Sequence, residues 1–221
     1  MPAASAPYDS HGPGRASRRR TVAPRHRPAC YRCLKPEVAC ICATIEPVEN
    51  QTGITILQHP RERLHAVGTS RIARLGLAKV RVEWCTQWAD GSAIRARLPE
   101  HAALLYPAEG ARELSTLPIE ERPHHLVVID GTWFHAKKIY DAHRWLRGLP
   151  RVSLTPNAPS RYRIRREPQA RCMATIEAIV AALRIIEPQT VGLDGLLRCF
   201  TRMVDRQATF APVPASSPIG S

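Results

Sequence analysis

Short apolar runs that alternate with helical patterns are the feature that most constrains the fold of this chain. Ala102–Tyr106 and Leu126–Ile129 are apolar throughout, which is typical of strands buried on both faces of a parallel sheet. Gly53–Gln58 and Val80–Trp84 also have the composition of strands. Strands that alternate with helices predict an α/β fold with a mostly parallel sheet and helices on both faces.

Three segments are predicted to form the helices that cover the sheet: Thr69–Ala78, Trp133–Leu146 and Ala170–Ile186. The third has apolar residues at helical spacing, namely Met173, Ile176, Ile179, Val180 and Leu183. Residues at this spacing lie on one face of a helix, so we expect that face to pack against the sheet.

The distribution of charge and apolar residues indicates one main domain between two tails. With 221 residues, of which 44% are hydrophobic, the chain can bury one sizeable core. Residues 1–28 hold six Arg against one acid, so a disordered basic tail is expected there. The Pro- and Ser-rich residues 209–221 are expected to form a second tail. We place a small cysteine-rich unit at 29–46 and the main domain at 47–208.

The net charge of +13 indicates a polyanionic partner such as a nucleic acid. No apolar run approaches the roughly 18 residues that would span a bilayer, and the N-terminus lacks the apolar stretch of a signal peptide. We therefore expect no membrane contact and a cytoplasmic location. In such a reducing compartment, clustered cysteines bind metal or react more often than they form disulfides.

Four of the seven cysteines form a cluster with the spacing C-x2-C-x6-C-x-C, made of Cys30, Cys33, Cys40 and Cys42. Four thiolates suit a tetrahedral Zn²⁺ ion without an open position, so we expect a structural zinc knuckle over 29–46. An iron–sulfur cluster and free buried thiols are the alternatives. The dispersed Cys85, Cys172 and Cys199 are expected to be small core residues.

A second motif follows the buried strand at Leu126–Ile129: Asp130-Gly131-Thr132-Trp133 leads directly into a predicted helix. In a parallel sheet, ligands bind at the carboxyl ends of the strands. Gly131 permits a tight turn, Thr132 can cap the helix, and the first N–H groups of the helix can bind an anion. The plainer alternative is that Asp130 or Thr132 only caps the helix while Trp133 packs it on the sheet.

The Asp130–Trp133 motif resembles the signature of the DTW domain family, and further motifs of that family follow in the same order over residues 29–205. They are the cysteine pairs before Cys42-Ala43-Thr44-Ile45, His59-Pro60-Arg61-Glu62, Thr69-Ser70-Arg71, Leu105-Tyr106-Pro107-Ala108-Glu109-Gly110-Ala111, Tyr162-Arg163-Ile164-Arg165-Arg166-Glu167-Pro168, and Ala174-Thr175-Ile176-Glu177-Ala178. The chain departs from the family at Met173–Thr175, where a Leu-Ser-Thr-like start is expected.

This resemblance implies a tRNA-uridine aminocarboxypropyltransferase with a SPOUT-like fold, a fold that can be knotted. Such enzymes transfer the 3-amino-3-carboxypropyl group of S-adenosyl-L-methionine to the imide nitrogen of a uridine. The implied cofactor-binding residues are Tyr106, Pro107, Glu109, Gly110, Gly131, Thr132 and Trp133. Asp130 is the candidate catalytic residue, as a base that accepts the imide proton or as a group that orients the imide.

The candidate RNA-binding residues are arginines, because guanidinium groups bind phosphates through paired hydrogen bonds. They are Arg61, Arg161, Arg163, Arg165 and Arg166. His59 is a weaker candidate for the same surface. Two other functions stay open: a SPOUT-like RNA methyltransferase, and a zinc-containing RNA-binding protein without catalysis. The oligomeric state is also open.

Overall fold

The computed structural model describes residues 28–65, 67–156, 160 and 172–209. Its centre is a six-stranded sheet with the order β2-β1-β5-β3-β6-β4. Neighbouring strands pair in parallel throughout. The strands are β1 Gly53–Gln58, β2 Val80–Trp84, β3 Ala102–Leu105, β4 Arg112–Glu113, β5 His125–Asp130 and β6 Arg151–Ser153. The predicted parallel sheet is therefore confirmed.

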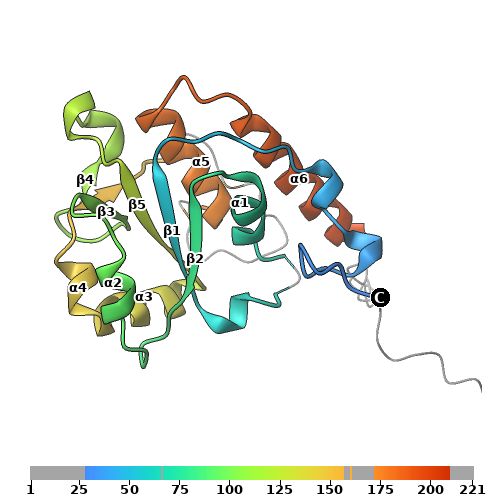
Figure 1. Cartoon of the computed structure of the whole chain (residues 1–221), viewed down its shortest axis with the longest axis horizontal. Coiled ribbons are helices and arrows are strands. Elements are labelled where there is room, and N and C mark those ends of the chain that lie inside the picture. Colours follow the sequence, from blue (N-terminus) through green and yellow to red (C-terminus); the bar gives the residue numbers. More distant parts are fainter. Residues whose placement is uncertain (1–27, 66, 157–159, 161–171, 210–221) are drawn as a thin grey trace, which may run out of the picture.

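Helices cover both faces of the sheet, as predicted. Figure 1 shows α1, α5 and α6 on one side and α2, α3 and α4 on the other. Their bounds are α1 Ser70–Gly76, α2 Ser92–Ala96, α3 Trp133–Ala142, α4 Arg144–Arg147, α5 Thr175–Ile186 and α6 Leu193–Thr209. Short 3₁₀ turns lie at Glu37–Ala39, Cys42–Thr44, Pro60–Glu62, Leu114–Thr116 and Ile119–Glu121.

The alternation of side chains along β5 explains why both faces are apolar. Leu126 and Val128 join the larger core with α1, α5 and α6. Val127 points the other way, into the smaller core with Ile139 of α3 and Leu146 of α4. A strand enclosed in this way needs apolar residues at successive positions, which accounts for the continuous run in the sequence.

The single helix predicted over Trp133–Leu146 is interrupted at His143, where the backbone has φ −98° and ψ 96°. The buried His143 ring lies with Nε2 2.8 Å from the carbonyl oxygen of Thr86 and 3.4 Å from Sγ of Cys85. These contacts fix the imidazole beneath the loop after β2. The chain therefore leaves the helix at this residue and restarts as α4.

The predicted buried face of α5 is confirmed for Ile176, Ile179, Val180 and Leu183, which are all fully buried. It is wrong for Met173, which lies before the helix, is half-buried and lines the cavity at the start of α5. The helix begins at Thr175 rather than Ala170, and residues 161–171 lie outside the described part of the chain. Cys85, Cys172 and Cys199 are buried, as expected of small core residues.

The helix α6 was not among the predicted elements. It presents an apolar stripe to the larger core, made of Leu193, Leu196, Cys199, Phe200, Met203 and Val204. Charged residues separate these positions in the sequence. Their spacing of three and four is nevertheless the helical period, so the signal was present.

The cysteine-rich N-terminal segment packs against α1 and α6 (Figure 1). Cys33 and Ile41 belong to the larger core. The Thr44 hydroxyl contacts Sγ of Cys199 on α6 at 3.2 Å, and Nη2 of Arg74 on α1 donates to the carbonyl of Arg32. The segment is therefore fastened to the main domain by both apolar and polar contacts.

The two expected tails and the possible knot stay predictions. Residues 1–27 and 210–221 lie outside the described residues, so the two expected tails are untested. A knot would involve the connection from β6 to α5, which includes residues outside the description. Among the described helices, none combines the length and apolar character needed to cross a bilayer.

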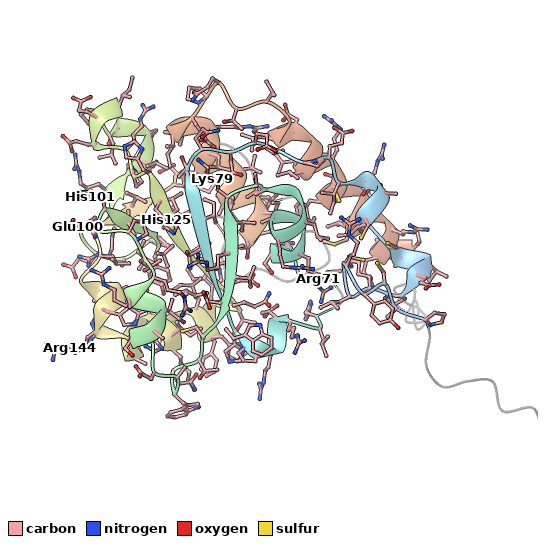
Figure 2. The ribbon with its side chains drawn as sticks, viewed as in Figure 1. Arg71, Lys79, Glu100, His101, His125 and Arg144 are labelled. Carbon is pink, nitrogen blue, oxygen red and sulfur yellow. The ribbon has the colours of Figure 1, made fainter. Side chains whose placement is uncertain are left out.

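His125 is a partly buried histidine at the start of β5. Its ring packs against Gly53, where an added Cβ would lie 2.4 Å from Nδ1, and its Nε2 lies 2.9 Å from the Thr55 hydroxyl (Figure 2). Burial lowers the pKa of His125 below its ordinary value of 6.5, and Arg81 lowers it further. The unfolded chain therefore takes up this proton before the folded chain does.

We predict that the free energy of unfolding falls between about pH 7.5 and about pH 5.5, and that His125→Gln reduces this loss. Denaturant unfolding at both pH values measures this loss of unfolding free energy. The exposed neighbour His124 provides the matched control, His124→Gln, which should keep the full pH dependence. Equal pH dependence in the two variants would contradict the assignment.

Candidate active site and metal centre

A cavity of about 410 Å³ opens at the carboxyl ends of β5, β3 and β6. Its walls come from the segments that follow these strands and from the starts of α3 and α5. The lining residues nearest to the strand ends are Tyr106, Pro107, Asp130, Gly131, Ser153 and Leu154. Its position is where ligands bind in parallel α/β sheets, and its size suits a small organic molecule.

Asp130, the last residue of β5, lines this cavity although it is only 5% exposed. Its Oδ2 accepts a hydrogen bond of 2.9 Å from Nε2 of Gln58, and its Oδ1 accepts one of 2.5 Å from the Thr175 hydroxyl. These two hydrogen bonds therefore fix the orientation of the carboxylate group. Each oxygen keeps a further lone pair, so the group can still accept a proton or a hydrogen bond from a ligand.

Two helices begin at the cavity. Thr132 caps α3, because its hydroxyl accepts from the backbone N–H of His135 at 3.2 Å. Thr175 is the first residue of α5, and Ala174 before it also lines the cavity. The N–H groups in the first turn of a helix have no partners within the helix, so the start of α3 favours a negatively charged ligand group. At the start of α5, the Glu177 carboxylate already accepts from the N–H of Ala174.

Aromatic rings form one wall of the cavity. Tyr106 stacks on Tyr140 of α3 with 4.6 Å between ring centroids, and Trp133 lies 6.3 Å from Tyr106 at a tilt of 43°. Phe134 also lines the cavity and is 63% exposed. Aromatic faces can stack on a heterocyclic base and attract a cation, so this wall suits a positively charged nucleoside.

The cavity brings together most of the residues predicted to bind the cofactor. Tyr106, Pro107, Gly131, Thr132 and Trp133 line it around Asp130. Glu109 and Gly110 do not line it; they are exposed in the loop between β3 and β4. Gly110 has φ +74°, a conformation that favours glycine, so the turn itself accounts for this residue.

The role of the predicted RNA-binding arginines stays a prediction. Arg61 is exposed in the 3₁₀ turn after β1 and does not line the cavity. Arg161, Arg163, Arg165 and Arg166 lie outside the described residues.

A pair of stacked histidines lies beside the Asp130 turn. The ring centroids of His59 and His135 are 3.9 Å apart and their planes are nearly parallel, at 4°. Nδ1 of His135 lies 3.0 Å from the Thr132 hydroxyl. Burial lowers the pKa of His59, and the neighbouring His135 and Arg61 lower it further. The sequence drew attention to His59 but not to His135.

Three residues that were not predicted from the sequence to belong to the site also shape it: Gln58, Glu62 and Thr175. Gln58 carries an amide at the end of a buried strand, which is the signal that could have identified it, because buried polar groups need partners. Glu62 is a buried acid that lines the cavity.

The four clustered cysteines converge as predicted. Their sulfur atoms all lie within 4.8 Å of one another, with 3.7 Å between Cys30 and Cys42 and between Cys33 and Cys40. Four sulfurs about 2.3 Å from a tetrahedral Zn²⁺ would lie about 3.8 Å apart. The cluster is therefore placed to hold a metal ion.

The thiols of the cluster are not shifted alike: burial raises the pKa of Cys42 to about 12, whereas backbone N–H groups act on Cys30 in the opposite direction. The backbone N–H groups of Cys33 and Arg32 lower the pKa of the Cys30 thiol to about 6. Hydrogen bonds from these groups favour the thiolate, which is the form that binds metals.

Comparison with known proteins identifies the family of this chain. The DTW domain model matches residues 27–208. The chain belongs to the DTW domain family. No solved structure matches the chain significantly.

The curated relatives of this DTW domain protein described below are all named as tRNA-uridine aminocarboxypropyltransferases. This chain is 30% identical over 188 residues to tRNA-uridine aminocarboxypropyltransferase 2 of Macaca fascicularis, and the match covers 79% of this chain and 61% of the relative. The chain is 31% identical over 191 residues to the Drosophila melanogaster protein of that name, and the match covers 79% of this chain and 73% of the relative. The chain is 27% identical over 221 residues to tRNA-uridine aminocarboxypropyltransferase A of Arabidopsis thaliana, and the match covers 83% of this chain and 82% of the relative. The chain thus spans about 61% of the length of the macaque relative.

We predict that the purified DTW domain protein contains about one tightly bound metal ion per chain, measured by elemental analysis. Cys33→Ser should remove the metal and lower the free energy of unfolding, because the buried Cys33 ties the cluster to the core. Cys85→Ser is the control, since Cys85 is buried far along the chain beside His143. Metal-free protein that remains natively folded would contradict the metal site.

Proposed function

We propose that this DTW domain protein transfers the 3-amino-3-carboxypropyl group of S-adenosyl-L-methionine to the imide nitrogen of a tRNA uridine. The observation that carries the proposal is the Asp130 carboxylate, fixed by two hydrogen bonds at the wall of an aromatic cavity. The names of the curated relatives support the same reaction. The proposed activity implies a cytoplasmic location.

The residues of the cavity fit S-adenosyl-L-methionine. Its volume of about 410 Å³ is ample for a nucleoside with a short side chain. Tyr106 and Trp133 offer ring faces to the adenine and the cation, while the start of α3 offers N–H groups to the carboxylate. When bound, this donor supplies an electrophilic carbon next to a positively charged sulfur, which leaves as a neutral thioether.

Asp130 would act on the acceptor. The imide nitrogen of uridine carries a proton, and its lone pair is spread into two carbonyl groups, so attack requires that the proton be lost. A carboxylate fixed by Gln58 and Thr175 can accept this proton as the new carbon–nitrogen bond forms. The same two hydrogen bonds orient it toward the cavity.

We further propose that the metal held by the four cysteines is a structural Zn²⁺. Four thiolate ligands leave no open position for catalysis. Cys33 lies in the larger core, so the ion would fasten the N-terminal segment to α1 and α6.

Incubating the full chain with S-adenosyl-L-methionine and unmodified tRNA tests the reaction. Mass spectrometry of the digested nucleosides should show aminocarboxypropyl uridine. Methylated uridine would instead indicate a methyltransferase, and unmodified tRNA that still binds would indicate a protein without catalysis.

We predict that Asp130→Asn lowers transfer by about 10²- to 10⁴-fold, the range for loss of a positioned acid or base. Asn has the same shape as Asp, and its side-chain carbonyl can accept the hydrogen bond from Gln58. Its amide group can donate to the Thr175 hydroxyl, which would then accept a hydrogen bond instead of donating one. The substitution therefore removes the charge and the basic oxygen without breaking the network.

Single-turnover rates with bound tRNA and donor measure this effect. Asp141→Asn is the control, because Asp141 is an exposed acid of α3 that pairs with Lys137. Near-normal transfer by Asp130→Asn would eliminate the base role.

A further inference from the structure

A second cavity, of about 270 Å³, lies next to the proposed reaction site. Gln58 connects the two: it lines this second cavity, and its side chain donates to Asp130, which lines the first. Ser70 also lines the second cavity, while Thr69 before it lines the first. The two cavities therefore lie on either side of one thin wall.

The second cavity contains a buried cation with unused donors. Arg71 is 4% exposed and lies between α1 and the N-terminal segment (Figure 2). Its Nη2 donates to the carbonyl of Arg63. Within the described residues, its Nε and Nη1 have no hydrogen-bond partner. A charged group withdrawn from water is costly unless an anion accepts its hydrogen bonds, so these donors indicate a place for an anionic ligand.

The other charged residues of this cavity have the same sign. Arg63 and Arg74 line it beside Arg71, and none of the described lining residues is an Asp or Glu. Arg74 is exposed, while its Nη2 donates to the carbonyl of Arg32. Three guanidinium groups without a carboxylate among them favour phosphate.

Two exposed aromatic rings complete the cavity. Trp84, at the end of β2, is 58% exposed, and the guanidinium of Arg63 lies 4.6 Å from its ring centroid. Tyr31, between the first two cysteines, is 97% exposed. Rings beside arginines are the usual platforms on which unpaired bases stack. An acidic peptide would use the cations but would have little use for the rings.

We propose that this cavity binds the RNA strand next to the target uridine, with a phosphate on Arg71 and an unstacked base on Trp84 or Tyr31. The inference rests on the proposed function and adds a contact surface that neither the DTW motif nor the predicted arginines include. It also gives the N-terminal segment a role in substrate binding, because Tyr31 comes from that segment.

The test measures binding of unmodified tRNA to the full chain over a range of salt concentrations. Trp84→Ala should weaken binding by roughly 5- to 100-fold through the loss of one stacked base. Arg74→Gln should reduce the slope of log affinity against log salt by about 0.7 to 0.9, as expected for one lost phosphate contact. Both residues are exposed, so neither substitution should disturb the core. Arg74→Gln also removes the hydrogen bond to the Arg32 carbonyl, so its free energy of unfolding is measured beside its binding, and an unchanged value shows that the N-terminal segment is still in place.

Matched controls have the same chemistry away from the cavity. Trp88 is 84% exposed and does not line it, and Arg95 is an exposed residue of α2 on the other face of the sheet. Trp88→Ala and Arg95→Gln should bind tRNA like the parent chain. Calorimetric titration with S-adenosyl-L-methionine should give the same affinity for all four variants, because the donor lies on the other side of the wall.

The outcomes separate this inference from the proposed function. If Trp84→Ala and Arg74→Gln bind tRNA as tightly as the controls, the RNA surface is wrong even if the parent chain modifies uridine. If the parent chain binds tRNA through Trp84 but modifies nothing, the surface stands and the reaction is wrong. Polyglutamate binding that depends on Trp84, with no tRNA binding, would overturn the surface in favour of an acidic protein partner.

Discussion

The Asp130 carboxylate is the interaction on which the rest of the site depends. It accepts from Gln58 at the end of β1 and from Thr175 at the start of α5. These bonds connect two adjacent strands with a helix that is distant in the sequence. A buried carboxylate needs such donors, and the same donors fix the direction in which it faces the cavity. One polar network thus closes the end of the sheet and fixes the Asp130 carboxylate at the cavity wall.

The parallel sheet explains why this network lies beside the ligand cavity. All the strand ends meet at one edge, and the chain turns there into helices whose first N–H groups have no partners within the helix. Thr132 and Thr175 stand at two such starts. The acid, the aromatic rings and the helix starts are therefore brought together by the topology.

The sequence predicted the sheet because strands enclosed on both faces must be continuously apolar, as Leu126–Ile129 shows. It also predicted the cysteine cluster, whose geometry is set by local spacing. It did not predict the break at His143, which depends on the distant Cys85 and Thr86. The partners of Asp130 were missed for the same reason: Gln58 and Thr175 become neighbours only after folding.

A structure of the full chain with an unreactive donor analogue and tRNA would show whether Asp130 faces the imide of a uridine. We expect the analogue to lie against Tyr106 and Trp133, and a uridine imide nitrogen to lie about 2.6–3.2 Å from an Asp130 oxygen. A uridine bound away from Asp130, or a donor bound outside this cavity, would contradict it.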